Sequence, residues 1–140
     1  MSKYNLPSEI KGEWIWNSSL EGKTSFPVFL RREFTIDAGS SSFDFWIAAA
    51  SSFHVFINGT YVGYGHSRAS EEICYAFQYD VSCYLQSGLN VIGILVKNSS
   101  KESFRSGRGE GVWCQLNANN SPFIWSESRW KISAGTCYEN

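Results

Sequence analysis

The chain lacks several features that would assign it to common functional classes. No apolar run approaches the roughly 20 residues of a membrane-spanning helix, so we expect no membrane partner. No basic stripe is visible and the formal net charge is -1, so nucleic acid is not an expected partner either. The first residues contain no apolar stretch of the signal-peptide type. The compartment therefore stays open between a bacterial cytoplasm and export with a leader that is not included in this sequence.

Residues that commonly bind metals are also scarce. The chain has two His and four Cys, and no two Cys form a Cys-x-x-Cys pair. Neither a zinc site nor any other cofactor is therefore expected. We expect buried free thiols rather than disulfides at the four cysteines, which are Cys74, Cys83, Cys114 and Cys137.

Helical periodicity is nearly absent, and aromatic residues are plentiful at 16% of the chain. Short apolar segments alternate with polar residues, and turn signals recur roughly every 8 to 15 residues. Aromatic and β-branched side chains suit a pleated, half-buried surface. The pattern predicts an all-β sandwich or barrel. We expect one domain over residues 1–140, because no repeat and no linker is visible.

The alternation predicts individual elements. The run from Asn90 to Lys97 is almost continuously apolar, which favours a central strand covered on both faces. Asn58-Gly59 suits a type I′ hairpin turn. One helical turn is expected over residues 80–85, with Asp80 or Ser82 as its cap, and a long loop over residues 98–111. Strands are expected at residues 12–16 (or an extended lead-in), 28–36, 43–49, 53–57, 61–64, 75–79, 90–97, 112–116, 123–125 and 130–133.

Five stretches, in order along nearly the whole chain, resemble the N-terminal β-sandwich domains of bacterial α-L-rhamnosidases. Trp14-Ile15-Trp16 is similar to their opening W-x-W, and the stretch from Phe29 to Phe34 to their F-x-R-K-x-F strand. Residues 48–63 resemble the hairpin A-x-x-x-Y-x-L-Y-I-N-G-x-x-V-G. Residues 79–92 resemble Y-D-V-T-x-x-L-x-x-G-x-N-x-I, and residues 126–131 resemble T-D-x-x-W-K.

The resemblance implies a jelly-roll β-sandwich of the galactose-binding-domain-like type. It also implies that the chain is a fragment of a larger glycoside hydrolase, whose catalytic helical barrel lies several hundred residues later. The expected partners are that neighbouring catalytic domain and, as a second candidate, carbohydrate. Related sandwiches hold a structural Ca²⁺, but no Asp-rich loop signals one here.

The sequence gives little support for catalysis by the chain itself. A glycosidase needs two carboxylates roughly 5 to 9.5 Å apart, and the acidic residues here are mostly isolated along the sequence. Neither His54 nor His66 stands in a recognisable nucleophile context, and His54 should face away from the core residues beside it. We therefore expect no catalytic residue in this chain.

Candidate sugar-binding residues come from two polar loops. Sugar sites combine an aromatic platform with Arg, Asp, Glu or Asn groups that bind hydroxyls. A structural role competes at each position, because loop arginines are usually solvated and a tryptophan that begins a strand is usually core. The candidate residues are Tyr64, His66, Arg68, Arg105, Arg108, Glu110 and Trp113.

Three functional hypotheses remain open at this stage. The first is a non-catalytic accessory domain that supports the catalytic domain of an α-L-rhamnosidase-like hydrolase. The second is an autonomous carbohydrate-binding module for rhamnose- or galactose-type sugars, and the third is a protein-interaction sandwich without a sugar role. The first also predicts exposed apolar surface where a neighbouring domain would dock.

Overall fold

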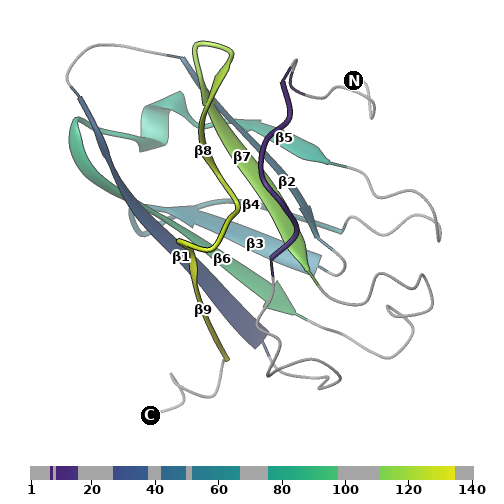
Figure 1. The fold of residues 1–140 in the computed structure, drawn as a ribbon. Coiled ribbons are helices and arrows are strands. Elements are labelled where there is room, and N and C mark those ends of the chain that lie inside the picture. The colour runs from purple at the N-terminus through teal and green to yellow at the C-terminus, as the bar shows by residue number, and fades with distance from the viewer. Residues whose placement is uncertain are drawn as a thin grey trace.

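The computed structural model describes residues 7, 9–15, 27–37, 42–49, 52–66, 76–97 and 111–134. In these residues the chain forms nine antiparallel strands and one short 3-10 helix, so the predicted all-β sandwich is confirmed. Figure 1 shows the two sheets packed face to face. The elements are β1 (Pro27–Ile36), β2 (Phe43–Ala49), β3 (Ser52–Ile57), β4 (Thr60–His66), β5 (Phe77–Asp80), η2 (Ser82–Tyr84), β6 (Gly88–Lys97), β7 (Val112–Ala118), β8 (Ser121–Trp125) and β9 (Lys131–Ala134).

One sheet has five strands in the order β4-β3-β6-β1-β9, and the other has four in the order β5-β2-β7-β8. Side chains alternate between the two faces of each strand, so every second residue points into the space between the sheets. Burying these apolar side chains supplies the main driving force for folding. The largest of the fully buried ones are Phe45, Phe53, Leu30, Ile47, Ile57, Ile92, Ile94 and Leu116.

Strand β6 is central in its sheet, as its apolar sequence predicts, because it pairs with β1 on one side and β3 on the other. The prediction that both its faces are covered is wrong. Ile92, Ile94 and Val96 are buried, whereas Val91 and Leu95 on the other face are only partly buried. The outer face of the five-stranded sheet is thus open along the middle strand.

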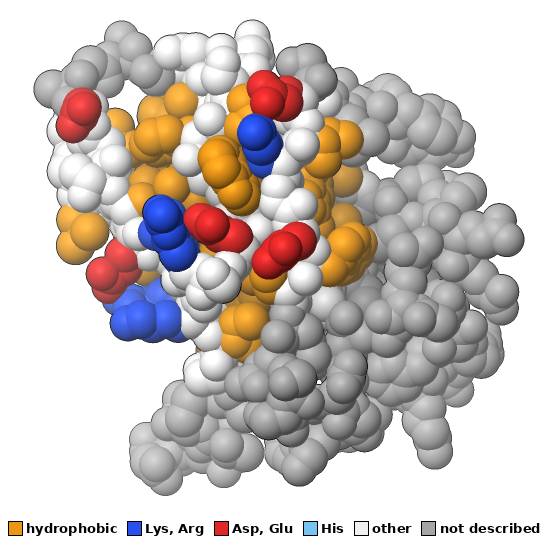
Figure 2. Space-filling view, in the orientation of Figure 1, with side chains coloured by type: hydrophobic (Ala, Val, Ile, Leu, Met, Phe, Trp, Pro, Cys, Tyr) orange, Lys and Arg blue, Asp and Glu red, His pale blue; other side chains and the backbone are white. Residues whose placement is uncertain are grey.

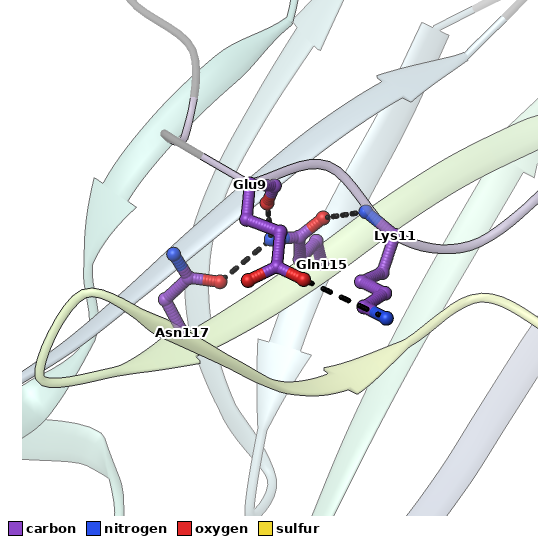
Figure 3. Close-up of polar contacts among 4 residues, drawn as sticks. All are labelled: Glu9, Lys11, Gln115 and Asn117. Atoms are coloured by element: carbon purple, nitrogen blue, oxygen red, sulfur yellow. Dashed lines mark hydrogen bonds and ion pairs between the residues drawn. The ribbon is translucent and has the colours of Figure 1, made fainter.

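The outer face of the four-stranded sheet is covered by residues 9–15, which we call the N-terminal strap. In Figure 1 the purple strap crosses β7. It forms no regular strand, apart from an isolated bridge between Ile15 and Val112. Figure 3 shows how the side chain of Gln115 holds it: the amide donates to the Glu9 carbonyl at 2.8 Å, and its oxygen accepts from the Lys11 N–H at 2.8 Å. The strap accounts for the burial of polar Gln115 on an outer face.

Two turns of the sandwich match the sequence patterns in part. Asn58 and Gly59 have φ angles of 52° and 83°, as a type I′ hairpin turn requires. The predicted helical turn is only the three-residue η2, and its N-cap is Val81, not Asp80 or Ser82. Asp80 instead accepts hydrogen bonds from the Ser82 backbone N–H at 3.1 Å and its hydroxyl at 2.9 Å. The Asp80 carboxylate thus fixes the residues that lead into η2, which begins two residues later than expected.

Two of the four cysteines lie in the described residues, and both are free thiols as expected. Cys114 is buried, and burial raises the pKa of its thiol far above the usual range. Cys83 is exposed, so the expectation of a buried thiol is wrong there. Cys74 and Cys137 lie outside the described residues. No helix in the described part of the chain is long and apolar enough to span a bilayer.

Candidate functional site

Four aromatic rings cluster on the outer face of the β3–β4 hairpin, and we call them the aromatic face: His54, Phe56, Tyr61 and Tyr64. The rings of His54 and Tyr64 stack, with centroids 5.7 Å apart and planes at 25°. The ring of Tyr61 lies 5.9 Å from that of His54 and 5.3 Å from that of Phe56. Tyr64 is 66% exposed and Tyr61 is 47% exposed. The four rings form one contiguous surface that solvent reaches.

An irregularity in the hairpin places both tyrosines on this face. Residues three apart on a regular strand point to opposite faces. The register of β3 and β4 shifts between Val55 and Phe56, so that Tyr61 pairs with Phe56 while Tyr64 pairs with His54. A bulge of this kind re-aims side chains. It brings the rings of Tyr61 and Tyr64 to 5.9 Å and 5.7 Å from the same His54 ring.

Hydrogen bonds hold parts of the aromatic face in place. The Tyr61 hydroxyl lies 3.3 Å from Nδ1 of His54. The Tyr79 hydroxyl on β5 donates to the backbone carbonyl of Tyr64 at 3.0 Å and ties the hairpin to the other sheet. Burial and, to a smaller extent, the nearby Tyr61 together raise the pKa of Tyr79 to about 12. Tyr79 is therefore a neutral hydrogen-bond donor across the physiological range.

The predicted site residues are not all brought together. Tyr64 belongs to the aromatic face. His66 ends β4, but its side chain lies outside the described residues, as do Arg68, Arg105, Arg108 and Glu110. Trp113 is 8% exposed and packs with Trp46 on the other sheet, where its indole N–H donates to the Lys11 carbonyl at 2.8 Å. The strap covers Trp113, an arrangement typical of packing rather than of an open platform.

Sequence reasoning missed three members of the aromatic face: His54, Phe56 and Tyr61. The signal for two of them was present. His54 and Phe56 alternate with the buried Phe53, Val55 and Ile57, so they had to share the outer face. His54 faces away from the core as expected, but the sequence pattern did not mark it as a sugar-binding candidate. Tyr61 lies on this face only because of the bulge, and no motif in the sequence predicts the bulge.

One pair of carboxylates that are far apart in the sequence is brought together on the other sheet. Asp44 on β2 lies opposite Asp80 on β5. Burial raises the pKa of Asp44, and the charge of Asp80 raises it further. Hydrogen bonds from Ser82 lower the pKa of Asp80 and commit that carboxylate to the turn. Among the described residues, no three His, Cys, Asp or Glu gather as metal ligands would.

Comparison with known proteins finds similarity in fold but no match in sequence. No protein-family model matches the chain, and no curated protein matches it in sequence. Among solved structures, the GH78 family rhamnosidase of Bacillus sp. GL1 superposes with a TM-score of 0.77 at 20% sequence identity. The α-L-rhamnosidase of Streptomyces avermitilis, solved with L-rhamnose, gives a TM-score of 0.65 at 18% identity. A lectin from Pleurotus ostreatus gives 0.62 at 19% identity.

The shares of each chain that match are unequal. The Bacillus enzyme covers 89% of this chain, but this chain covers only 13% of the enzyme. For the Streptomyces enzyme the shares are 87% and 12%, and for the lectin they are 87% and 34%. At these identities the likeness is one of fold. The chain is a β-sandwich domain that resembles one part of the α-L-rhamnosidases, as its sequence motifs predict.

Proposed function

We propose that this chain is a non-catalytic accessory domain of an α-L-rhamnosidase-like glycoside hydrolase, and that it holds carbohydrate on the aromatic face. The observation that carries the proposal is the exposure of Tyr61 and Tyr64 on the β3–β4 hairpin beside His54 and Phe56. Aromatic rings usually bury their apolar bodies, and a contiguous exposed cluster indicates a binding surface.

The chemistry of the aromatic face suits a pyranose ring. The C–H face of the sugar packs on an aromatic ring, and the tyrosine hydroxyls and the His54 ring offer hydrogen bonds to its hydroxyls. Likeness of fold to rhamnosidase domains and to a lectin is consistent with this role. The proposed sugar is of the rhamnose or galactose type. The loop residues Arg68, Arg105, Arg108 and Glu110 remain proposed contributors to sugar binding.

The domain organisation and the lack of catalysis belong to the same proposal. Residues 1–140 form one domain, whose neighbour in the larger chain is the catalytic domain. Asp44 and Asp80 are two described carboxylates that lie close enough for the charge of Asp80 to raise the pKa of Asp44. The Asp80 carboxylate already accepts a hydrogen bond from the Ser82 N–H. A paired acid and base at that point is therefore disfavoured. The chain should release no nitrophenol from nitrophenyl α-L-rhamnopyranoside.

A calorimetric titration tests sugar binding. L-rhamnose, D-galactose and oligosaccharides that contain them are titrated into the protein at millimolar concentrations. The double variant Tyr61→Ala and Tyr64→Ala removes most of the exposed aromatic area and should weaken binding at least about tenfold, which corresponds to about 1.4 kcal/mol. The matched control is Ile10→Ala, because Ile10 is 57% exposed but lies on the strap of the other sheet.

The alternatives make different predictions in the same experiment. An autonomous binding module binds these sugars without its neighbour, whereas an interaction sandwich binds none of them. Absence of heat with every glycan at millimolar concentration eliminates sugar binding by the isolated domain. Equal loss of binding in Ile10→Ala and in the tyrosine variant contradicts the assignment to the aromatic face.

A further inference from the structure

A basic pocket opens beside β1 and the start of β9, on the same sheet as the aromatic face. It has a volume of about 190 Å³ and is lined by Arg31, Arg32, Glu33, Arg129 and Lys131. Figure 2 shows basic side chains next to acidic ones at the left of the view, where Figure 1 has β1. The volume is below the 300 to 1,000 Å³ of drug-sized pockets and suits one small polar group.

The positive charge of the basic pocket is only partly neutralised. Glu33 pairs with Arg31 at 2.7 Å. Glu127 is shared by two arginines at long distances, 4.0 Å from Nη2 of Arg32 and 3.8 Å from Nε of Arg129. These two carboxylates face four cationic side chains. A net positive charge therefore remains at the pocket.

The partly buried side chain of Arg32 contributes to this net positive charge. Arg32 lies on the same face of β1 as the core residues Leu30 and Phe34, and its side chain is 15% exposed. Its Nη1 donates to the Glu33 carbonyl at 2.7 Å, but its buried Nε has no partner among the described residues. Lys131 likewise has no ion pair within the described part of the chain, and it lies directly opposite Arg31. Burying an under-paired arginine is unfavourable, so its presence calls for a role.

The chemistry of these side chains indicates the ligand. Guanidinium groups bind planar and tetrahedral oxyanions through paired N–H donors, and a lysine adds a mobile positive charge. Arg129 is 72% exposed and Arg31 is 50% exposed, so both can reach a ligand from solvent. A carboxylate or a sulfate is a group of this kind.

The pairing of the strands connects the basic pocket to the aromatic face. Tyr61 on β4 pairs with Phe56, Phe56 pairs with Gly93 on β6, and Gly93 pairs with Arg31. Adjacent strands lie about 4.8 Å apart, so Phe56 and Arg31 are about 10 Å apart across the sheet. Two linked sugar rings span such a distance.

Gly93 lies between the aromatic face and the basic pocket, and it leaves the backbone between them without a side chain. A Cβ built at this position would meet no atom of the described residues within 4 Å. Packing therefore does not require a glycine there, and glycine weakens a strand interior. A bare strand between an aromatic platform and a basic pocket permits close approach of a ligand.

We propose that the basic pocket is an oxyanion subsite, which takes the carboxylate or sulfate of an acidic saccharide whose neighbouring ring lies on the aromatic face. The sugar part of this inference rests on the proposed function. The oxyanion part rests on the basic pocket alone, so the two can fail separately.

A titration followed by NMR of backbone and arginine Nε–H groups tests the subsite. The probes are sodium sulfate, a neutral galactose disaccharide, and the same disaccharide with a carboxylate or a 6-sulfate on one ring. The last two distinguish carboxylate from sulfate. We expect sulfate and both acidic disaccharides to shift the Nε–H signals of Arg31 and Arg129. The better acidic disaccharide should bind about tenfold more tightly than the neutral one, and added salt should weaken that preference.

A charge variant and its control assign the effect. Arg129→Gln with Lys131→Gln should remove the preference for the acidic disaccharide and leave the affinity for the neutral disaccharide unchanged. Lys11→Gln, on the strap of the other sheet, should change neither. Equal affinity for the neutral and both acidic disaccharides, or arginine signals that sulfate does not move, overturns the oxyanion subsite. If sulfate shifts these signals but no sugar shifts the aromatic face, the proposed function fails and the oxyanion subsite remains.

A second variant tests the path between the two surfaces. Gly93→Val puts a branched side chain at this bare position and suits a strand, so the fold should be kept, which thermal unfolding checks. We expect it to weaken an acidic disaccharide about tenfold while inorganic sulfate still binds the pocket. Unchanged disaccharide affinity in a folded Gly93→Val protein overturns the path.

Discussion

Asn90 is a fully buried polar residue whose side chain makes four hydrogen bonds. Its oxygen accepts from Nδ2 of Asn58 at 2.9 Å and from the Gln86 N–H at 3.0 Å. Its amide donates to the carbonyls of Gln86 at 2.8 Å and Gly88 at 3.0 Å. One side chain thus joins the β3–β4 turn to the loop before β6. The hairpin that bears the aromatic face is anchored here.

Replacing Asn90 by Ala should be among the more destabilising changes outside the apolar core. It leaves three backbone groups without this partner and removes one of the two hydrogen bonds that the Asn58 amide donates. We expect a loss of about 3 kcal/mol in the free energy of unfolding. Urea unfolding measures it. Gln86→Ala is the control, because its exposed amide makes one hydrogen bond, to the Leu89 carbonyl, and should cost about 1 kcal/mol or less. Equal losses in the two variants contradict the anchoring role.

At the scale of elements, two glycines of β4 allow the two sheets to pack closely at the edge where β4 faces β5. A Cβ at Gly63 would lie 2.7 Å from Cε1 of Tyr79, and one at Gly65 would lie 2.6 Å from Cζ of Phe53. Both distances are below van der Waals contact. The aromatic rings of the core therefore reach under the hairpin only because these positions have no side chain. The same arrangement lets the Tyr79 hydroxyl bond the Tyr64 carbonyl.

Gly63→Ala should destabilise the protein by about 1 to 3 kcal/mol, because the added methyl group overpacks the contact with Tyr79. Gly93→Ala is the matched control, since its Cβ would meet no described atom within 4 Å. That control should be neutral or stabilising by about 0.5 to 1 kcal/mol. Thermal and urea unfolding of both variants make the comparison. A Gly63→Ala protein as stable as Gly93→Ala would show that the edge tolerates a side chain.

Most strands could be predicted from the sequence because their patterns are local. Alternation around Phe53, Val55 and Ile57 located β3, and Asn58-Gly59 located its turn. The aromatic face could not be predicted in full, because the bulge that turns Tyr61 towards His54 depends on strand pairing. The wrong prediction for β6 has the same cause. The sequence of one strand does not show whether another element covers the face on which the apolar Leu95 lies. The basic pocket was missed because Arg31 and Lys131 meet only through the pairing of β1 with β9.

At the scale of the whole molecule, the strap makes a third layer over the four-stranded sheet. Its described hydrogen bonds to the sheet come from its backbone: Glu13 N–H donates to the Ser126 carbonyl at 3.0 Å, and the Glu13 carbonyl accepts from the Ser126 hydroxyl. Ile15 exchanges two backbone bonds with Val112. Trp113 became buried through contacts about 100 residues apart in sequence, which local patterns do not reveal.

Because the backbone of the strap makes these contacts, the residue that receives them should matter more than the strap's own side chains. Gln115→Ala leaves the Glu9 carbonyl and the Lys11 N–H without partners, and we expect a loss of about 2 to 3 kcal/mol. Lys11→Ala keeps those backbone bonds and removes an exposed ion pair with Glu9 at 3.6 Å and a contact with the Trp125 ring, together worth about 1 kcal/mol or less.

Urea unfolding and tryptophan emission of the folded proteins distinguish the two variants. If the strap loosens in Gln115→Ala, water reaches Trp113 and the emission of the native protein shifts to longer wavelength, whereas Lys11→Ala leaves it unchanged. A Gln115→Ala protein with native emission and native stability would mean that the bonds of Glu13 and Ile15 hold the strap without Gln115. Sugar binding should persist in both variants, because the aromatic face belongs to the opposite sheet.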